Sequence, residues 1–420
     1  MHRERVAVIG SGVAGLTAAY LLQRRYEVLL FEADDRLGGH AHTHDVLTPD
    51  GRTIAVDTGF IVHNRKTYPN LLRLFGELGV RVKDAEMSMS VRCEGCGLEY
   101  AGARRLGGLF AQPANLLRPR YLRMLGEILR FHRHARRLLA EPDTGDTTLG
   151  AFLAIGGYSR YFVDHFVLPV VSAVWSADRE TAKQYPARYL FTFLNHHGML
   201  SIGGSPIWRT VVGGSRGYVD LAVKNLTAIH LSSPVRTLRR TADGIELIDE
   251  TDQRHLLDRV VVATHPDQAL RLLAEPTEAE AAVLGAFRYS RNETCLHRDP
   301  ALLPKAPGAR ASWNYYKPAC HAESDKVLVS YDMNRLMRLG EPGEYVVTLN
   351  ATDRISPANR LATTVYEHPI YTPESVAAQR ELPGLNDGRI AFAGAYHGWG
   401  FHEDGCAAGV RAAESLGVRW

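Results

Sequence analysis

The stretch from residue 6 to residue 32 constrains the fold more than any other part of the chain. Four apolar residues lead into a Gly-x-Gly-x-x-Gly motif at 10–15, a helical pattern follows, and the apolar run 28–31 ends in an acid. A buried parallel strand, a tight turn, a helix and a second strand produce this order. The sequence therefore predicts an α/β fold built on a Rossmann-like unit.

The residues of this motif have separate physical roles. Gly10 allows the turn, Gly12 leaves room for a pyrophosphate against the backbone, and Gly15 lets the helix lie close to the strand. The helix N-terminus attracts phosphates, and Glu32 ends the second strand where it can accept hydrogen bonds from a ribose. The stretch therefore predicts a dinucleotide-binding site.

Length and composition indicate the number of domains and argue against some classes of protein. With 420 residues the chain is too long for one simple core, so we expect two domains. A net charge of +3 argues against a nucleic-acid partner. Five cysteines, mostly far apart, suggest reduced thiols and a cytoplasmic location. The longest apolar stretch, residues 166–175, is too short to span a bilayer, and no signal peptide is evident.

Hydrophobic periodicity predicts the remaining elements in outline. Gly107 and Gly108 indicate a loop. We expect helices over 67–78, most of 152–200 and from the turn at 213–217 to residue 228, strands over 87–92, 98–100, 230–238 and 260–263, a hairpin over 244–257, a second sheet between 294 and 372, and a final strand at 389–393 before the last helix.

Two clusters of metal-binding residue types occur. Cys93 and Cys96 form a Cys-x-x-Cys with no second pair, which favours a polar hairpin turn over a zinc site or a redox pair. His196 and His197 have no third ligand at a readable spacing, which favours structural histidines. From the sequence we therefore expect no metal.

The segment from residue 103 to residue 139 is strongly basic. It carries one acid, Glu127, and apolar residues recur at helical spacing from Tyr121, so one face of the expected helix 118–139 is apolar and the other basic. Either the apolar stripe packs on the protein and the basic face is solvated, or the helix docks on an anionic membrane surface. The arginines are Arg104, Arg105, Arg118, Arg120, Arg123, Arg130, Arg133, Arg136 and Arg137.

Further glycine motifs follow the first in a fixed order. A Gly38-Gly39 loop, an Asp-x-Gly-Phe turn at 57–60, a Gly-Gly-Ser turn at 213–215, the strand 260–263 and the Gly-Phe-His-Glu-Asp-Gly run at 400–405 complete the set. In this order the chain resembles the flavin amine oxidase superfamily, which includes carotenoid desaturases, protoporphyrinogen oxidase and fatty-acyl isomerases. It also resembles a bacterial subgroup of predicted NAD/FAD-binding proteins linked to fatty acyl modification. The usual Arg after the Gly-Gly pair is replaced here by His40.

The resemblance implies non-covalent FAD and an interleaved chain. Residues 1–80, 205–290 and 385–420 would form the discontinuous FAD-binding domain, and residues 81–204 and 291–384 an α+β substrate domain. No cysteine occurs over 368–385, so a thioether to the flavin is not expected there. The implied contacts to FAD are Gly10, Gly12, Val13, Ala14, Gly15, Glu32, Ala33, Arg36, Gly38, Gly39, His40, Thr58, Gly59, Phe60, Val235, Thr264, Gly394, Phe401, His402 and Glu403.

The type of reaction is inferred from the motifs that the sequence contains besides those for the flavin. One glycine fingerprint without a second indicates that the organic substrate, and not a nicotinamide, reduces the flavin. His402 is the candidate acid or base near the flavin, and packing at the helix start is its alternative role. The leading hypothesis is an FAD-dependent desaturase or oxidase of an apolar substrate, such as an unsaturated or methylated fatty acyl chain of phospholipid. The alternatives are an amine or amino-acid oxidase, a redox-neutral acyl isomerase, and a flavin-binding protein without turnover.

Overall fold

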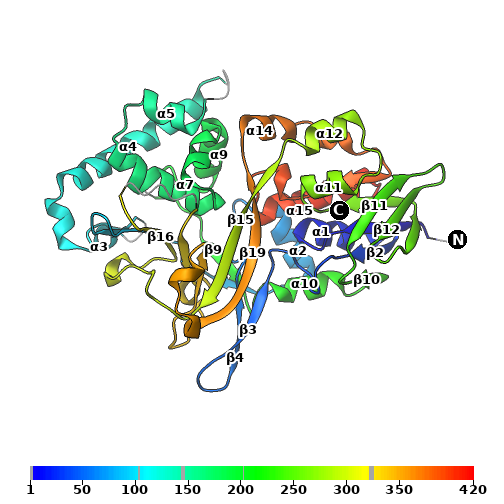
Figure 1. Ribbon diagram of the computed structural model, residues 1–420, viewed down its shortest axis with the longest axis horizontal. Coiled ribbons are helices and arrows are strands. Elements are labelled where there is room, and N and C mark those ends of the chain that lie inside the picture. The colour runs from blue at the N-terminus through cyan, green and yellow to red at the C-terminus, as the bar shows by residue number, and fades with distance from the viewer. Residues whose placement is uncertain (1–2, 103–104, 143–146, 202, 321–325) are drawn as a thin grey trace.

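The computed structural model describes residues 3–102, 105–142, 147–201, 203–320 and 326–420. A region of helices lies at one end of the long axis and the sheet that carries the glycine motif at the other (Figure 1). Two long paired strands, β15 (Arg288–His297) and β19 (Arg360–Ile370), run between the two ends. The molecule is therefore a mixed α/β protein, as the sequence predicts.

The sheet that carries the glycine motif has five parallel strands gathered from three parts of the chain. Val6 and Val8 of β1 face one core, and Ala7 and Ile9 face the other, because successive side chains of a strand alternate between its two faces. Both faces are covered, as a parallel sheet requires. The strand order is β10 (Ala228–His230), β2 (Glu27–Phe31), β1 (Arg5–Ile9), β14 (Arg259–Val262) and β20 (Ile390–Phe392).

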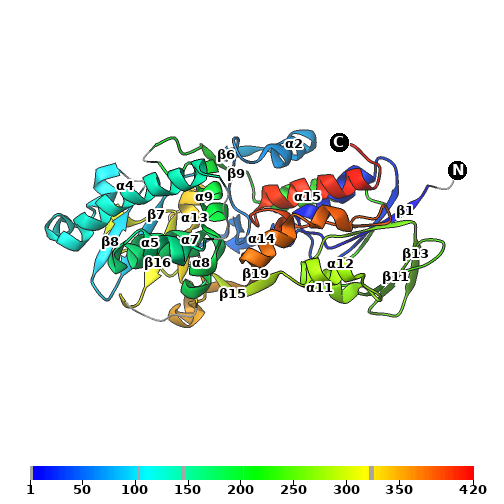
Figure 2. The same ribbon diagram turned by 90° about the horizontal axis from the view of Figure 1, so that it is seen from above.

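Helices cover the two faces of this sheet, on opposite sides in Figure 2. On one face α15 packs directly on α1, because a Cβ at Gly409 would lie 2.3 Å from the carbonyl oxygen of Ala14. The other face carries α11, α12 and a small antiparallel sheet. The bounds are α1 (Val13–Leu22), α2 (Pro69–Leu78), α10 (Arg216–Val223) and α15 (His402–Ser415) on the first face, and α11 (Pro266–Leu272), α12 (Glu278–Leu284), β11 (Val235–Arg240), β12 (Ile245–Asp249) and β13 (Arg254–Leu257) on the second.

A second sheet, of seven strands, lies between the two ends of the molecule. Only the β16–β7 pair is parallel, and the other neighbours are antiparallel. The order is β19, β15, β18 (Val346–Leu349), β17 (Val329–Asp332), β16 (Trp313–Lys317), β7 (Met89–Cys93) and β8 (Leu98–Ala101).

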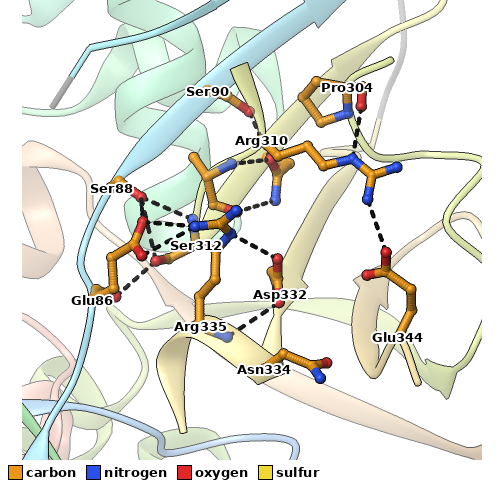
Figure 3. Close-up of polar contacts among 12 residues, drawn as sticks. Glu86, Ser88, Ser90, Pro304, Arg310, Ser312, Asp332, Asn334, Arg335 and Glu344 are labelled. Atoms are coloured by element: carbon orange, nitrogen blue, oxygen red, sulfur yellow. Dashed lines mark hydrogen bonds and ion pairs between the residues drawn. The ribbon is translucent and has the colours of Figure 1, made fainter. Parts of the chain in front are cut away.

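A polar cluster fixes the parallel junction of this sheet (Figure 3). The Arg335 guanidinium, on the short helix α13 (Met333–Leu336), donates to the Glu86 carboxylate at 3.1 and 3.2 Å and to Asp332 at 3.0 Å. Ser312 Oγ donates to the Glu86 backbone carbonyl at 2.7 Å. These bonds hold the start of β7 against β16 and β17. No hairpin connects β7 to either of these two strands.

The helical end packs around a core of aromatic side chains. Phe131 of α4 contacts rings from α5, α6 and α9, and Tyr121 and Met124 of α4 are fully buried. The helices are α3 (Arg105–Leu109), α4 (Pro119–Ala140), α5 (Leu149–Ile155), α6 (Arg160–Phe162), the π-helical turn η2 (Val163–Val167), α7 (Leu168–Trp175), α8 (Arg179–Gln184) and α9 (Ala187–His196).

Short strands complete the fold. The hairpin of β3 (Thr43–Leu47) and β4 (Thr53–Asp57) stands apart, and β5 (His63–Asn64), β9 (Trp208–Val211) and β6 (Val82–Asp84) form a third small sheet. The helix α14 (Pro373–Gln379) follows β19. Within the described ranges, no helix combines the length and the hydropathy that crossing a membrane requires.

Three predicted elements were wrong. The strand expected over 230–238 is broken between β10 and β11, where Ser232 has a φ of +47° and the backbone N–H of Ser233 donates to the Glu32 carbonyl. Gly107 lies inside α3 and not in a loop, because Leu109 of this short helix packs on the aromatic core. The helix after the turn at 213–217 ends at Val223, five residues before its predicted end.

Candidate functional site

The glycine turn has the geometry expected of a pyrophosphate site. Gly10 has a φ of +96°, and a Cβ there would lie 2.7 Å from the carbonyl oxygen of Ala263. A Cβ at Gly15 would lie 1.9 Å from the carbonyl oxygen of Gly10, so helix α1 rests directly on the turn. By contrast, a Cβ at Gly12 would meet nothing within 4 Å. The open space therefore lies in front of Gly12, where a ligand would approach the backbone.

Helix α1 presents its N-terminus to that space. Gly12 is its N-cap residue, no side chain caps it, and its first turn, which includes Val13 and Ala14, contains no acid. The first backbone N–H groups of a helix have no partner within the helix, and the helix dipole favours negative charge there. The end of α1 is therefore suited to bind phosphate.

Glu32 lies at the carboxyl end of β2, beside the turn. Its carboxylate accepts from the Ser11 backbone N–H at 2.8 Å, from Ser11 Oγ at 2.5 Å and from the Asp34 N–H at 3.0 Å. These bonds hold the carboxylate in place without occupying all its acceptor positions. Ala33 follows it and is exposed, and Val235 begins β11 just beyond the segment that pairs with residues 32–34.

The Gly38-Gly39 loop lies on the glycine turn. Gly38 has a φ of +108° and Gly39 a φ of +56°, and a Cβ at Gly39 would lie 3.2 Å from the Gly12 Cα. Arg36 donates through Nη1 to the Gly39 carbonyl at 2.9 Å and brings a positive charge to this loop. The loop therefore closes one side of the open space in front of Gly12.

The loop connects to the Asp-x-Gly-Phe turn through His40. Its carbonyl accepts from the Phe60 N–H at 2.7 Å, and a Cβ at Gly59 would lie 2.2 Å from the same oxygen. Burial, with further contributions from His368 and His265, lowers the pKa of His40 well below its ordinary value. His40 is therefore neutral and does not supply the charge of the Arg that it replaces.

The buried carboxylate of Asp57, which the sequence did not assign to the site, fixes the turn at 57–60. Asp57 accepts from Thr43 Oγ1 at 2.6 Å and from the Ser215 N–H and Oγ at 2.9 and 2.8 Å. Burial raises the pKa of Asp57 to about 6. The next residue, Thr58, places its Oγ1 2.7 Å from the Tyr366 hydroxyl. The Asp57 carboxylate thus joins the turn at 57–60 to the Gly-Gly-Ser turn at 213–215.

The C-terminal motif reaches the same region. Thr264 follows β14, and its Cγ2 would lie 3.5 Å from a Cβ at Gly10. Gly394 follows β20 and leads to the start of α15. A Cβ at Gly405 would lie 2.6 Å from Val13 Cγ1, so the first turns of α15 and α1 are in contact. The structure thus brings together the predicted residues from all three parts of the chain.

The first turn of α15 contains two half-buried acids. Glu403 accepts from the backbone N–H and side-chain amide of Asn70 at 3.0 and 2.7 Å and from the Leu71 N–H at 3.0 Å, so it caps helix α2. Asp404, which sequence reasoning did not assign, accepts from the Phe401 N–H at 2.9 Å. Burial raises the pKa of Asp404 to about 7.

His402 has the contacts of a packed histidine. Its ring stacks on Phe60 with the centroids 3.6 Å apart, and its Nε2 lies 2.8 Å from the Tyr218 hydroxyl. Burial lowers the pKa of His402 to about 3, so the imidazole is neutral. These contacts favour a structural role, and the catalytic assignment stays a prediction for mutagenesis to test.

A cavity of about 290 Å³ lies at the start of α15. Phe193 stacks on Phe401 at 4.7 Å, and Trp399 lies 6.1 Å from Phe193. Trp399 Nε1 donates to the Tyr189 carbonyl at 3.3 Å, which holds the indole ring in the wall of the cavity. The residues that line the cavity are Lys66, Thr67, Tyr68, Phe193, His196, His197, Trp399, Phe401, Glu403 and Asp404.

His197 is a structural histidine in the cavity wall, as the sequence indicates. His197 pairs through Nε2 with Thr67 Oγ1 at 3.1 Å and through Nδ1 with the Phe193 carbonyl at 3.0 Å. Burial lowers the pKa of His197 to about 4. The ring is therefore a neutral wall residue whose nitrogens already have partners.

These features fit FAD: the face of Gly12 is open, the N-terminus of α1 has no cap, and the Glu32 carboxylate has an acceptor position left. The fold and the site together define an FAD-dependent oxidoreductase. Residues 13–294 match the family of flavin containing amine oxidoreductases, and the chain belongs to that family.

Solved structures and a curated protein are also similar to the chain. Cyclohexylamine oxidase from Brevibacterium oxydans IH-35A is 16% identical with a TM-score of 0.70, over 99% of this chain and 98% of that one. The CLA-producing fatty acid isomerase from P. acnes is 14% identical with a TM-score of 0.67, over 97% of both chains. A flavin-dependent L-tryptophan oxidase of Lentzea aerocolonigenes is 50% identical over 42 residues, which span 10% of this chain and 9% of that protein. At these identities the solved structures establish the fold.

Proposed function

We propose that the protein uses FAD to oxidise a largely apolar substrate with an anionic end, of which a fatty acyl chain of phospholipid is the best candidate. The observation that carries the proposal is the aromatic cavity at Phe401, which has Lys66 in its lining. Phe401 is also one of the predicted contacts to the flavin. With Phe401 against the flavin, a substrate in the cavity would meet the cofactor.

The walls of the cavity suit an apolar substrate better than a cation. Phe193, Trp399 and Phe401 supply aromatic side chains to the lining. The two acids of the lining are engaged by backbone N–H groups, Glu403 with helix α2 and Asp404 with Phe401. A carboxylate that already accepts several hydrogen bonds has less capacity left to pair with an ammonium group.

The surface near the cavity suits a lipid source for the substrate. Helix α9 carries the cavity residues Phe193 and His196 and packs against the basic helix α4. Leu117, just before α4, is 85% exposed, and Leu122 and Leu129 of α4 are also exposed. Exposed leucines beside arginines are the combination that binds anionic membrane surfaces. Arg104, one of the nine predicted arginines, lies outside the described residues.

These contacts indicate a separate role for the cofactor and for each group of residues. Bound FAD would accept two electrons from the substrate, and the glycine turn, α1 and Glu32 would hold it. The aromatic walls would orient the apolar part of the substrate and exclude water. Lys66 would attract the anionic end.

Two related activities are the alternatives. Cyclohexylamine oxidase and a putrescine oxidase share this fold, and Asp404, whose pKa is raised to about 7 by burial, could take a proton from an ammonium substrate. The isomerase from P. acnes shares the fold as well, and its name describes chemistry on a fatty acid. A redox-neutral isomerase would change an acyl chain without net reduction of the flavin.

Anaerobic reduction of the flavin distinguishes these activities. The purified yellow protein is mixed without oxygen with phospholipid vesicles, free fatty acids, or small amines, and loss of the flavin absorbance is followed. Bleaching by lipid and not by amines supports the proposal, bleaching by amines alone refutes it, and a changed acyl chain without bleaching identifies the isomerase.

A matched pair of lysine variants tests the role of the cavity. Lys66→Gln should raise the KM for an anionic substrate, and Lys224→Gln, on the exposed end of α10, should not. Equal KM values for the two variants would contradict the assignment of the anionic end to Lys66.

A further inference from the structure

Four ligand residues from three distant parts of the chain meet at one edge of the seven-stranded sheet. Cys93 ends β7, Cys96 lies in the turn before β8, His165 lies in η2, and Cys320 follows β16. Their three sulfur atoms and one imidazole nitrogen all lie within 4.8 Å of one another. None of the four lines the cavity at Phe401.

Two of the separations between these atoms match the edges of a metal tetrahedron. Cys93 Sγ lies 3.6 Å from Cys320 Sγ, and Cys96 Sγ lies 3.6 Å from His165 Nε2. With Zn–S bonds of about 2.3 Å and Zn–N bonds of about 2.05 Å, tetrahedral zinc has S–S edges of about 3.75 Å and S–N edges of about 3.6 Å. A disulfide needs sulfur atoms about 2.05 Å apart and would leave the other two ligands without a role.

His165 is oriented as a metal ligand. Its Nδ1 lies 3.0 Å from the Tyr161 carbonyl, so Nδ1–H donates to that oxygen and the lone pair of Nε2 points toward the sulfur of Cys96. The Tyr161 ring stacks on the imidazole with centroids 4.1 Å apart. A carbonyl partner on the remote nitrogen fixes the tautomer of metal-binding histidines. The π-helical turn that carries His165 is a rare local structure that often marks a functional position.

The loops that carry the three cysteines pack directly against each other. A Cβ at Gly95 would lie 2.5 Å from the backbone nitrogen of Cys320, so the two loops that carry the ligands are in contact.

Charge balance also fits a metal. Three thiolates and one neutral imidazole around a divalent cation carry one net negative charge, and the buried cationic residue Lys317 ends β16, three residues before Cys320. His165 and Cys93 are each 1% exposed, so solvent does not compete for the site from their side.

We propose that Cys93, Cys96, His165 and Cys320 bind a structural Zn²⁺ ion. Four protein ligands leave no open coordination position, which is the arrangement of structural and not of catalytic zinc sites. The ion would join the β7–β8 hairpin, the helical end through η2 and the segment after β16. From the sequence alone the lone Cys-x-x-Cys gave no reason to expect a metal, because the other two ligands are 69 and 224 residues beyond Cys96.

Metal content measured by inductively coupled plasma mass spectrometry tests the proposal on the full flavoprotein. The protein is purified without chelator or metal-affinity resin and passed over a desalting column. We expect about one zinc per chain in the wild type. The zinc should be lost in Cys96→Ser and His165→Ala and retained in Cys295→Ser, a buried cysteine on β15 that belongs to a different core cluster.

Cobalt substitution keeps the proposal testable if a variant fails to fold. Zinc-depleted wild-type protein given Co²⁺ should show intense visible bands and thiolate-to-cobalt charge transfer, which report tetrahedral coordination by sulfur. Wild-type protein that contains no zinc and gives no such bands would overturn the proposal. A Cys93–Cys320 disulfide found by mass mapping of the unreduced protein would overturn it as well.

Discussion

The substitution Gly12→Ala separates cofactor binding from folding. A Cβ at Gly12 meets no atom of the protein within 4 Å, and the backbone there, with φ −63° and ψ 173°, is one that alanine adopts readily. We therefore expect the folded protein to lose no stability, and even to gain about 0.4–1 kcal/mol through the less flexible unfolded chain.

The substitution should weaken FAD binding, because the new methyl group occupies the space that the pyrophosphate is expected to fill. If the phosphates move away from two backbone N–H groups of α1, two charge-assisted hydrogen bonds worth about 1.5–3 kcal/mol each are lost. A total of about 3–6 kcal/mol raises the Kd for FAD roughly 100- to 10,000-fold.

The assay is a titration of the apoprotein with FAD, followed by quenching of the flavin fluorescence, together with chemical unfolding of the same sample. Gly15→Ala is the matched control. Its Cβ would lie 1.9 Å from the Gly10 carbonyl oxygen, so it should destabilise the fold itself by about 1–3 kcal/mol. A Gly12→Ala protein that binds FAD as tightly as the wild type would refute the placement of the pyrophosphate.

Three further substitutions test other parts of the structure. Asp404 titrates near about 4 when unfolded and at about 7 when folded, so the folded state holds the extra proton and stability falls as pH rises between these values, by up to about 4 kcal/mol. Asp404→Asn should flatten that slope in urea unfolding at several pH values, and an unchanged slope would contradict it. Arg335→Ala removes a cation from Glu86 and from the buried Asp332 and should lower the free energy of unfolding by about 2 kcal/mol, and an unchanged value would contradict this role of the cluster. His402→Gln should lower the unfolding temperature while FAD reduction keeps its rate, whereas a rate loss of about 100-fold or more at full FAD content would establish catalysis.

The sequence predicts those features that depend on neighbouring residues. The turn at 10–15 is defined by three glycines whose spacing allows one backbone path, and the strands on either side of Cys93 and Cys96 follow from local alternation. The order of the motifs identified the family and the cofactor, and the comparisons confirm both. The domain boundaries, the individual FAD contacts and the substrate stay predictions.

Features that depend on distant residues could not be predicted. Nothing near Glu403 in the sequence shows that it caps a helix that begins at Pro69. The break after β10 arises because residues 232–233 bond to the backbone of residues 32–34 and leave the strand direction. Cys96 and His165 are joined only by the tertiary fold. In each case tertiary contacts override a local pattern that is itself ambiguous.

The five-stranded sheet has a consequence for how the protein is made. Its central strand β1 lies between β2 and β14, and β14 in turn pairs with β20, which is synthesised long after β1. Helix α15, which packs on α1, is synthesised after β20. A nascent chain can therefore complete this sheet and the contact between α1 and α15 only once residues 390–415 have left the ribosome.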